Sequence, residues 1–373
     1  MGRGTVVTAL FRREVPAMLF LSTLCAAATF FYSQDPPPAP APTPTVATSP
    51  AEAAWAAAHA LKNKKDFEKA GAAFAAYARD FPGTPRSIEA IVEEGVCWFS
   101  IGRARQQLQQ NNQDSFQAFG RAELRFESVV QEHGASAVAG RAQYMRGTVA
   151  MFSGDLVGAE REYGTAIERY ASDPKYLPKS IERRAAVRRH LLKTAEARAD
   201  LTRYVREFPK GEDVESSKRY LAMVEQFEKP GPELVATSWV QGDAQSLASL
   251  RGDVVVLYFF ATWCENCEKA RPFLLDLQKR FEAMGVRWVG IVDRSKGQTL
   301  ESVRAFLGQN GIPFPVLQDN GGMSAAYRGQ KIPDIVVLDR LGRVRWHDNP
   351  ANLQDATIEL LLTEDPSAVS GAK

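Results

Sequence analysis

The sequence predicts an all-α domain of helical repeats followed by a smaller α/β domain. Residues 51–228 are rich in Ala, Glu, Arg and Gln, and their apolar residues recur at the spacing of helices. After the break KPGP at 229–232 the pattern changes to continuous apolar runs, which are typical of strands buried on both faces. The length of 373 residues allows two or three domains. We expect the two domains to fold independently on either side of this break.

The composition is that of a folded globular protein and excludes several classes of function. Apolar residues make up 45% and charged residues 24%, unlike a polytopic membrane protein. Lys plus Arg number 46 against 44 Asp plus Glu, so the net charge of +2 does not indicate a nucleic-acid partner. Four cysteines are too few for a disulfide-rich scaffold. We expect no metal and no other cofactor, because the single CxxC supplies only two ligands.

Residues 1–34 are predicted to be a membrane anchor or a signal segment. Three arginines precede an uncharged, largely apolar stretch at 15–34, which is long enough to span a bilayer. Positive charge before the stretch and none directly after it places the rest of the chain outside. The alanines at 26–28 offer a signal-peptide cleavage site, whereas TFFY at 29–32 extends the apolar run and favours an uncleaved anchor. Either way the protein is predicted to be extracytoplasmic, tethered to the inner membrane or free in the periplasm.

The segment 35–50 is predicted to be a proline-rich linker. Its run PPPAPAPTP cannot form a core and favours extended polyproline conformations. It is either a semi-rigid spacer that holds the domains away from the membrane or a connector without that role. Residues 366–373 are predicted to be a tail.

The region 51–228 resembles tetratricopeptide repeats. Its paired helical patterns end at Pro and Gly positions, and the last two units end about 35 residues apart, near 173 and 208. Such repeats commonly bind a protein ligand on a concave surface; the alternative is a helical spacer without a ligand. Cys97 is predicted to be a buried, inert thiol. The basic run at 183–189 is expected to be a solvated helix face or, as the alternative, a site for an acidic partner.

A CxxC pair carries the predicted chemistry. The run VVVLYFF at 254–260 predicts a buried strand, and a helical pattern follows Cys264 and Cys267. Residues three apart lie on one face of a helix, so the two sulfurs can form a disulfide. We expect Cys264 to attack, because the helix N-terminus stabilises its thiolate, and Cys267 to resolve the mixed disulfide. Half a zinc site or a structural disulfide are the rival interpretations, which the strand-to-helix context in an exported protein disfavours.

The rest of this domain is predicted as strands at 286–292, 335–339 and 344–346, with helices at 300–307 and near 353–362. Residues 232–363 resemble the TlpA-like (ResA-like) branch of the thioredoxin superfamily. The resemblance implies a thioredoxin-like fold for the domain, 229–365, and a membrane-anchored thiol–disulfide oxidoreductase. It rests on the segments SLASLRG (246–252, as the hairpin before the first core strand), FFATWCENC (259–267), GIPFPVLQD (311–319) and KIPDIVVLD (331–339).

The resemblance also implies roles for residues outside the cysteine pair. Pro333 matches the cis-proline of the family, and the backbone of Ile332 would pair with an extended substrate peptide. Pro272 matches a proline that kinks the active-site helix, and Trp263 belongs to the active-site run. Tyr258 stands where thioredoxins have a buried acid, so no proton acceptor for Cys267 is predicted.

The dipeptide between the cysteines tunes the redox balance. A carboxylate at Glu265, followed by Asn266, disfavours the Cys264 thiolate, so we expect a reductant. The resemblance agrees with this and implies reduction of disulfides in exported proteins, such as apocytochrome c in cytochrome c biogenesis. The partners of the protein would be a disulfide-containing substrate, a transmembrane thiol donor and a protein ligand of the repeats. The alternatives are a non-catalytic scaffold or a peroxiredoxin-like peroxidase, although Leu257 and Ala261 occupy positions where a peroxidase needs Pro and Thr.

Overall fold

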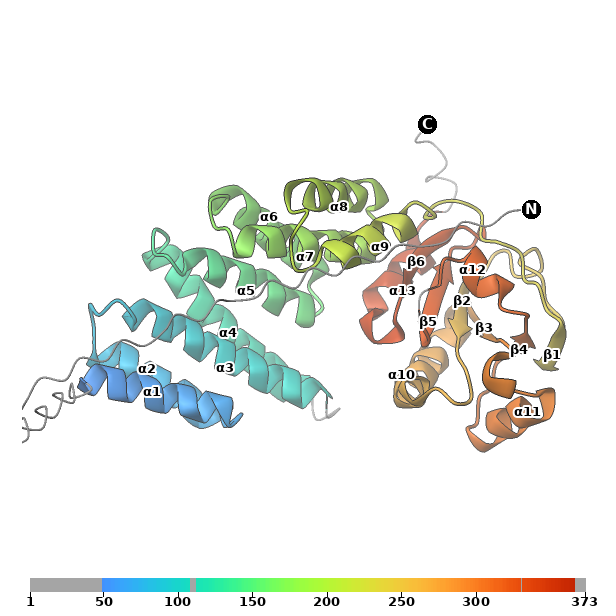
Figure 1. The fold of residues 1–373 in the computed structure, drawn as a ribbon, viewed down its shortest axis with the longest axis horizontal. Helices are drawn as coiled ribbons and strands as arrows, with labels where there is room; N and C mark the ends of the chain where they lie inside the picture. Colours follow the sequence, from blue (N-terminus) through green and yellow to red (C-terminus); the bar gives the residue numbers. More distant parts are fainter. Residues whose placement is uncertain (1–48, 108–111, 330, 366–373) are drawn as a thin grey trace, which may run out of the picture. The chain divides into compact units, whose positions relative to one another are not determined.

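The computed structural model describes residues 49–107, 112–329 and 331–365. In these ranges a series of helices leads into a domain with a six-stranded sheet (Figure 1). The predicted anchor, nearly all of the proline-rich linker and the tail lie outside the described residues. No helix within these ranges is long and apolar enough to cross a membrane.

The N-terminal part of the described chain is helical, as the sequence predicts. Each helix packs on the next one along the chain. The helices are α1 (Pro50–Asn63), α2 (Phe67–Asp80), α3 (Ser87–Gln107), α4 (Asn112–Glu132), α5 (Ala139–Phe152), α6 (Leu156–Arg169), α7 (Tyr176–His190), α8 (Thr194–Glu207) and α9 (Val214–Val224).

Three of the helical hairpins share one local geometry. Their second helices, α2, α6 and α8, each have 14 residues. A residue with positive φ makes the turn before each of them, and an aromatic C-cap residue donates its backbone N–H back into the last turn. The pairs of turn and cap residues are Lys65 and Phe81, Gly154 and Tyr170, and Leu192 and Phe208. This part of the chain therefore repeats a helical unit.

The basic run of α7 is largely engaged in ion pairs within the chain. Arg184 donates two hydrogen bonds to Asp200, at 2.9 and 2.7 Å, and Arg188 contacts the same carboxylate at 2.8 Å. Arg189 is buried and pairs with Asp348 of the α/β domain at 2.9 Å. The expectation of a solvated face is wrong for these three arginines, because acids of the same chain neutralise them.

The sheet of the α/β domain has the strand order β1-β4-β3-β2-β5-β6. The central pairs β2–β3 and β3–β4 are parallel, and β2–β5, β5–β6 and β1–β4 are antiparallel. The four predicted strands are confirmed, whereas β1 and β4 are additional. The predicted hairpin at 246–252 is wrong, because this segment forms turns. The strands are β1 (Ser238–Gln241), β2 (Val254–Phe259), β3 (Val286–Val292), β4 (Val316–Gln318), β5 (Asp334–Leu338) and β6 (Val344–Asp348).

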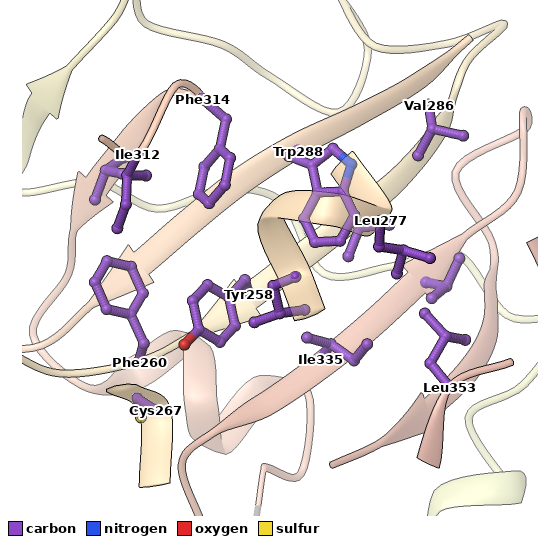
Figure 2. Packing of buried hydrophobic residues seen from close by; sticks show 14 of the residues in the cluster. Tyr258, Phe260, Cys267, Leu277, Val286, Trp288, Ile312, Phe314, Ile335 and Leu353 are labelled. Atoms are coloured by element: carbon purple, nitrogen blue, oxygen red, sulfur yellow. The ribbon is translucent and has the colours of Figure 1, made fainter. Parts of the chain in front are cut away.

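One face of the sheet is covered by α10 (Glu265–Phe281), α11 (Leu300–Gln309) and α13 (Asp355–Thr363). Tyr258 and Phe260 on this face belong to a cluster with Leu277 of α10 and Trp288 of β3 (Figure 2). The cluster reaches Cys267, which places the active-site helix against the main core.

The opposite face is covered in part by the helical region. Val224 at the end of α9 and Phe227 in the connection after it pack in one cluster with Leu257 of β2 and Tyr327, which follows α12 (Gly322–Ala326). The connection that follows also lies against the sheet domain, because Glu228 N–H donates to the carbonyl of Val344 at 2.7 Å. Within the break at 229–232, Gly231 N–H donates to the carbonyl of Gly342 at 2.8 Å, and the carbonyl of Lys229 accepts from Val344 N–H at 3.0 Å, so the break is hydrogen-bonded to the sheet domain and is not a free linker.

Candidate active site

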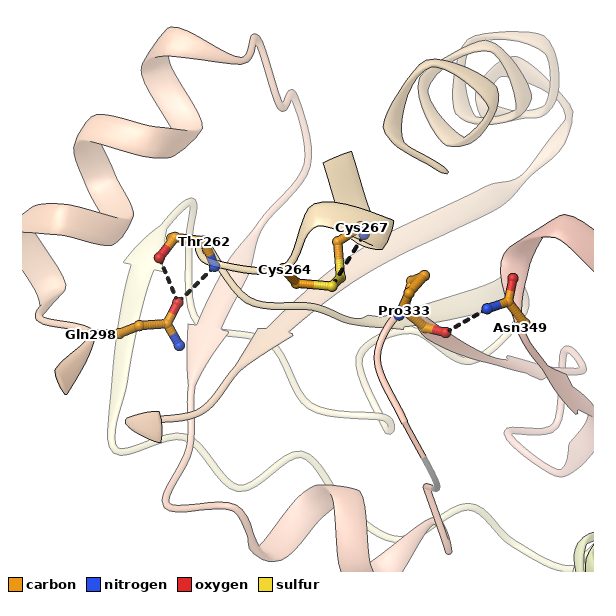
Figure 3. The surroundings of a disulfide bond; sticks show 6 residues. All are labelled: Thr262, Cys264, Cys267, Gln298, Pro333 and Asn349. Atoms are coloured by element: carbon orange, nitrogen blue, oxygen red, sulfur yellow. Dashed lines mark hydrogen bonds between the residues drawn. A yellow bond between two sulfur atoms is a disulfide. The ribbon is translucent and has the colours of Figure 1, made fainter. Parts of the chain in front are cut away.

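A disulfide joins Cys264 and Cys267 at the start of α10, with their Cα atoms 5.2 Å apart (Figure 3). Cys264 is the N-cap residue, and its sulfur accepts a hydrogen bond from the backbone N–H of Cys267 at 3.1 Å. The exposed fraction is 9% for Cys264 and 3% for Cys267. The sulfur of Cys264 thus lies where unpaired N–H groups and the helix dipole stabilise negative charge, and Cys264 is the more exposed residue of the pair.

The loop before the disulfide is fixed by a side chain from the neighbouring strand connection. The Oε1 atom of Gln298 accepts hydrogen bonds from both the backbone N–H and the hydroxyl of Thr262, at 2.7 and 2.8 Å (Figure 3). The Nε2 group of Gln298 donates to the carbonyl of Asp293 at 3.0 Å. Because β2 and β3 are parallel and adjacent, their carboxyl ends meet at the same sheet edge, and Gln298 links the two loops.

Trp263 is 41% exposed, and the ammonium group of Lys296 lies 3.7 Å from its ring centroid. This is a cation–π contact, and it comes from the same connection as Gln298. Asn266 is exposed beside the disulfide, and Pro272 lies inside α10, farther along the helix.

Glu265 is exposed and forms an ion pair with Lys269 at 2.7 Å, one turn along α10. The hydrogen bond from Lys269 lowers the pKa of Glu265 below its usual value. The carboxylate is therefore present at neutral pH, but a cation accompanies it.

Pro333 lies in the surroundings of the disulfide, and the Ile332–Pro333 peptide bond is cis (Figure 3). The position follows from strand register, because Asp334 pairs with Phe259 and the loop before it runs past the residues that lead into α10. The side-chain amide of Asn349 donates to the carbonyl of Pro333 at 3.2 Å. Among the described residues, the backbone of Ile332 has no hydrogen-bond partner, so its N–H and C=O are available to an extended peptide.

A buried polar pair lies directly beyond Pro333. His347 Nε2 is 2.8 Å from the carboxylate of Asp334, and both side chains are buried. By the strand register, His347 stands opposite Val336, whose side chain packs on the face away from α10. This pair therefore joins β5 to β6 and does not approach the sulfur of Cys267.

Tyr258 occupies the position of the missing buried acid. Its ring stacks on Phe260 with centroids 4.8 Å apart, and its hydroxyl is directed toward the end of the sheet where Cys267 lies (Figure 2). Burial raises the pKa of Tyr258 well above its usual value. The hydroxyl stays protonated at neutral pH and does not serve as a base.

The remaining described cysteine takes no part in this site. Cys97 is fully buried in the helical region, and burial raises the pKa of its thiol to about 12. The predicted burial of Cys97 is confirmed, and the raised pKa disfavours the thiolate, which is the reactive form.

The structure brings together Cys264, Cys267 and Pro333, with Ile332 directly before the proline. Gln298, Lys296 and Asn349 also belong to this site, although no sequence pattern had predicted them. The positions of Gln298 and Lys296 could have been predicted, because both follow β3, and residues at the carboxyl end of a strand parallel to β2 reach the same sheet edge. The position of Asn349 could not, because its contact depends on how β6 ends.

A thioredoxin-like sheet with a disulfide at the start of the helix after its central strand defines the class of thiol–disulfide oxidoreductases. A family model described as the AhpC/TSA family matches residues 226–347. The thioredoxin-like protein YneN of Bacillus subtilis is 31% identical over 130 residues, which cover 35% of this chain and 74% of YneN. The thiol–disulfide oxidoreductase ResA of Bacillus thuringiensis is 32% identical over 120 residues, or 32% of this chain and 67% of ResA.

Through its C-terminal domain the chain belongs to this family of thioredoxin-like thiol–disulfide oxidoreductases. Among solved structures, a thiol–disulfide isomerase of Corynebacterium glutamicum is 27% identical over 37% of this chain and 99% of its own, with a TM-score of 0.34.

Proposed function

We propose that this oxidoreductase reduces disulfides in exported proteins, at the outer face of the membrane to which its N-terminal segment anchors it. The observation that carries the proposal is the sulfur of Cys264 at the N-cap of α10, in one site with the backbone of Ile332, which has no hydrogen-bond partner in the part of the chain that the structure describes. One group would attack a disulfide, and the other would bind the peptide around it as an added strand. Apocytochrome c is a candidate substrate within this class.

The proposed reaction transfers two electrons and two protons. The thiolate of Cys264 attacks one sulfur of the substrate disulfide, which forms a mixed disulfide and releases the first substrate thiol. Cys267 then attacks the sulfur of Cys264, which forms the enzyme disulfide and releases the second substrate thiol. The enzyme dithiol is oxidised and the substrate disulfide is reduced. A transmembrane dithiol protein would restore the reduced enzyme.

The helical part is proposed to be a tetratricopeptide-like domain that recruits a protein partner. The shared length and cap geometry of α2, α6 and α8 support a repeated unit.

Trapping tests the proposal. In a Cys267→Ser variant the mixed disulfide cannot be resolved, so substrates from a periplasmic extract should remain covalently bound and be released by dithiothreitol. The reduced wild type should also reduce insulin and should not consume peroxide. Trapping by Cys264→Ser in place of Cys267→Ser would reverse the roles of the two cysteines. Failure of both trapping and insulin reduction would favour a non-catalytic scaffold, and peroxide consumption would favour a peroxidase.

A further inference from the structure

We propose that Arg189, a residue of the helical part, positions the Pro333 loop and thereby sets the affinity for substrate peptides. The inference rests on the proposed function, because it concerns the same peptide-binding loop. It makes the helical part a component of the active site in addition to any role in recruiting partners.

The first link joins α7 to the end of β6. The Nη2 atom of Arg189 donates to the carboxylate of Asp348 and to the carbonyl of His347, both at 2.9 Å. The side chains of Arg189 and Asp348 are only 4% and 13% exposed. The guanidinium also lies over the ring of Tyr220, 4.1 Å from its centroid. A charged pair enclosed in this way has a well-defined geometry, because little water competes with it.

The second link leads from Asp348 to the proline loop. The other carboxylate oxygen of Asp348 accepts hydrogen bonds from the backbone N–H of Asn349 at 2.7 Å and from the side chain of Asn352 at 3.1 Å. The side-chain oxygen of Asn349 accepts from Ala351 N–H at 3.0 Å, and its amide donates to the carbonyl of Pro333 at 3.2 Å. Asp348 therefore fixes the turn that carries the donor to Pro333.

The two links form a continuous set of hydrogen bonds from α7 to the residue beside the disulfide. Without Arg189, the carboxylate of Asp348 would be left partly buried without its cation and would turn toward water. The turn at 349–352 would lose its anchor, and the carbonyl of Pro333 would lose its fixed donor. Because Ile332 precedes Pro333, the strand edge offered to the substrate would become less well placed, and binding would weaken more than thiol chemistry.

The experiment compares full-length variants in two assays. Insulin reduction by the enzyme, with dithiothreitol as electron source, gives KM and kcat for a protein disulfide. Reaction of the reduced enzyme with dithionitrobenzoate, a small disulfide without a peptide backbone, reports thiol reactivity alone. The variants are Arg189→Met, Asn349→Asp and the double variant. Asn349→Asp keeps the acceptor for Ala351 N–H but removes the donor to the carbonyl of Pro333. The control is Thr357→Val, which removes the hydrogen bond between Thr357 and His190, another buried contact between α7 and the α/β domain.

Arg189→Met and Asn349→Asp should each raise KM for insulin roughly fivefold, the size expected for one hydrogen bond, with kcat and dithionitrobenzoate reactivity unchanged. The double variant should be no worse than the worse single variant, since both act on one contact. Thr357→Val should leave KM unchanged. If Arg189→Met does not fold, Arg189→Lys replaces it, because lysine keeps the charge but not the planar geometry.

An unchanged KM in the single variants would overturn the proposal, and so would additive effects in the double variant. An equal rise in KM for Thr357→Val would also overturn it, because any loosening of the interface would then suffice. These outcomes differ from failure of the proposed function, in which the wild type itself would not reduce insulin.

Discussion

Lys269 donates a hydrogen bond to Glu265 over 2.7 Å, and this ion pair lies within the first two turns of the helix that Cys264 caps. The sequence alone places a bare carboxylate beside the attacking sulfur. The structure adds the ammonium group of Lys269, 2.7 Å from this carboxylate, so the field of the carboxylate at Cys264 is partly offset. Both side chains are exposed, which weakens each effect further through solvent screening.

Single charge changes in this pair should therefore shift the redox potential in opposite directions. Lys269→Gln leaves Glu265 uncompensated, disfavours the thiolate and should lower the potential. Glu265→Gln leaves Lys269 uncompensated and should raise it. Each shift should be smaller than the ~30 mV that corresponds to a tenfold change in equilibrium constant for a two-electron couple. Equilibration with glutathione buffers at low salt measures both, with the double glutamine variant as the control that should match the wild type. Shifts of the same sign in the two single variants would contradict this account.

Gln298 should determine how well the active-site loop is ordered. Gln298→Ala removes the acceptor for two donors of Thr262, one of them a backbone N–H. The expected cost in the free energy of unfolding is about 2 kcal/mol, because a partly buried donor loses its partner. Turnover with insulin should fall roughly tenfold, since the residues leading into Cys264 lose their fixed geometry. Urea unfolding and the insulin assay check both effects. Gln309→Ala, at an exposed position at the end of α11, is the matched control and should change neither quantity.

Strong local patterns made much of this fold predictable from the sequence. The runs at 254–260 and 286–292 are apolar except for the exposed Arg287, because both faces of these central strands are covered, and they appear as β2 and β3. β4 has only three residues and β1 only four, too few for a pattern to stand out. The two strands exist because they pair with each other at the sheet edge, which is a tertiary effect.

In the candidate site, too, local features could be predicted from the sequence and tertiary contacts could not. The cysteine pair could be predicted because its chemistry depends on local spacing at a helix start. The contact of Asn349 with Pro333 could not, since it depends on how β6 ends. For Gln298 the order of strands indicates the sheet edge but not the partner, Thr262, which lies 36 residues away in the chain. The basic run of α7 was misjudged for the same reason, because its acidic partners include Asp348, 159 residues away from Arg189.

The packing of Phe227 predicts that the α/β domain depends on the helical part for stability. Phe227 is 3% exposed and lies in the cluster that covers the second face of the sheet. Phe227→Ala should destabilise this domain by about 3–5 kcal/mol, the usual cost of truncating a buried phenylalanine. Urea unfolding measures the loss of stability, and hydrogen–deuterium exchange of peptides from β2 and β5 in the folded protein locates it in this domain. Phe116→Ala, at a position that is 53% exposed, is the matched control and should have little effect on these peptides. Equal effects of the two variants would restore the expectation of independent folding.

His190 provides a pH-dependent contribution at the same interface. Its ring is 4% exposed, its Nδ1 atom is 3.0 Å from the hydroxyl of Thr357, and its centroid lies 5.6 Å from the ring of Trp346. Burial, assisted by the positive charge of Arg189, lowers the pKa of His190 from 6.5 to about 3. The folded protein therefore keeps this histidine neutral over a range in which the unfolded chain protonates it.

Stability should accordingly fall as the pH drops from 6.5 toward 3, because the unfolded state binds a proton that the folded state excludes. For this one group the free energy of unfolding should decrease by ~1.4 kcal/mol per pH unit in that window and be independent of pH above it. His190→Asn keeps a hydrogen-bonding group near Nδ1 but does not titrate, so the free energy of unfolding of this variant should decline with a slope shallower by that amount.

Urea unfolding of wild type and variant at several pH values measures the difference between their slopes, in which the contribution of the carboxylates cancels. Thr357→Val is the control. It should lower the free energy of unfolding by the same amount at every pH, so that its dependence on pH has the slope of the wild type. Parallel curves for wild type and His190→Asn would show that the histidine is protonated within the folded interface.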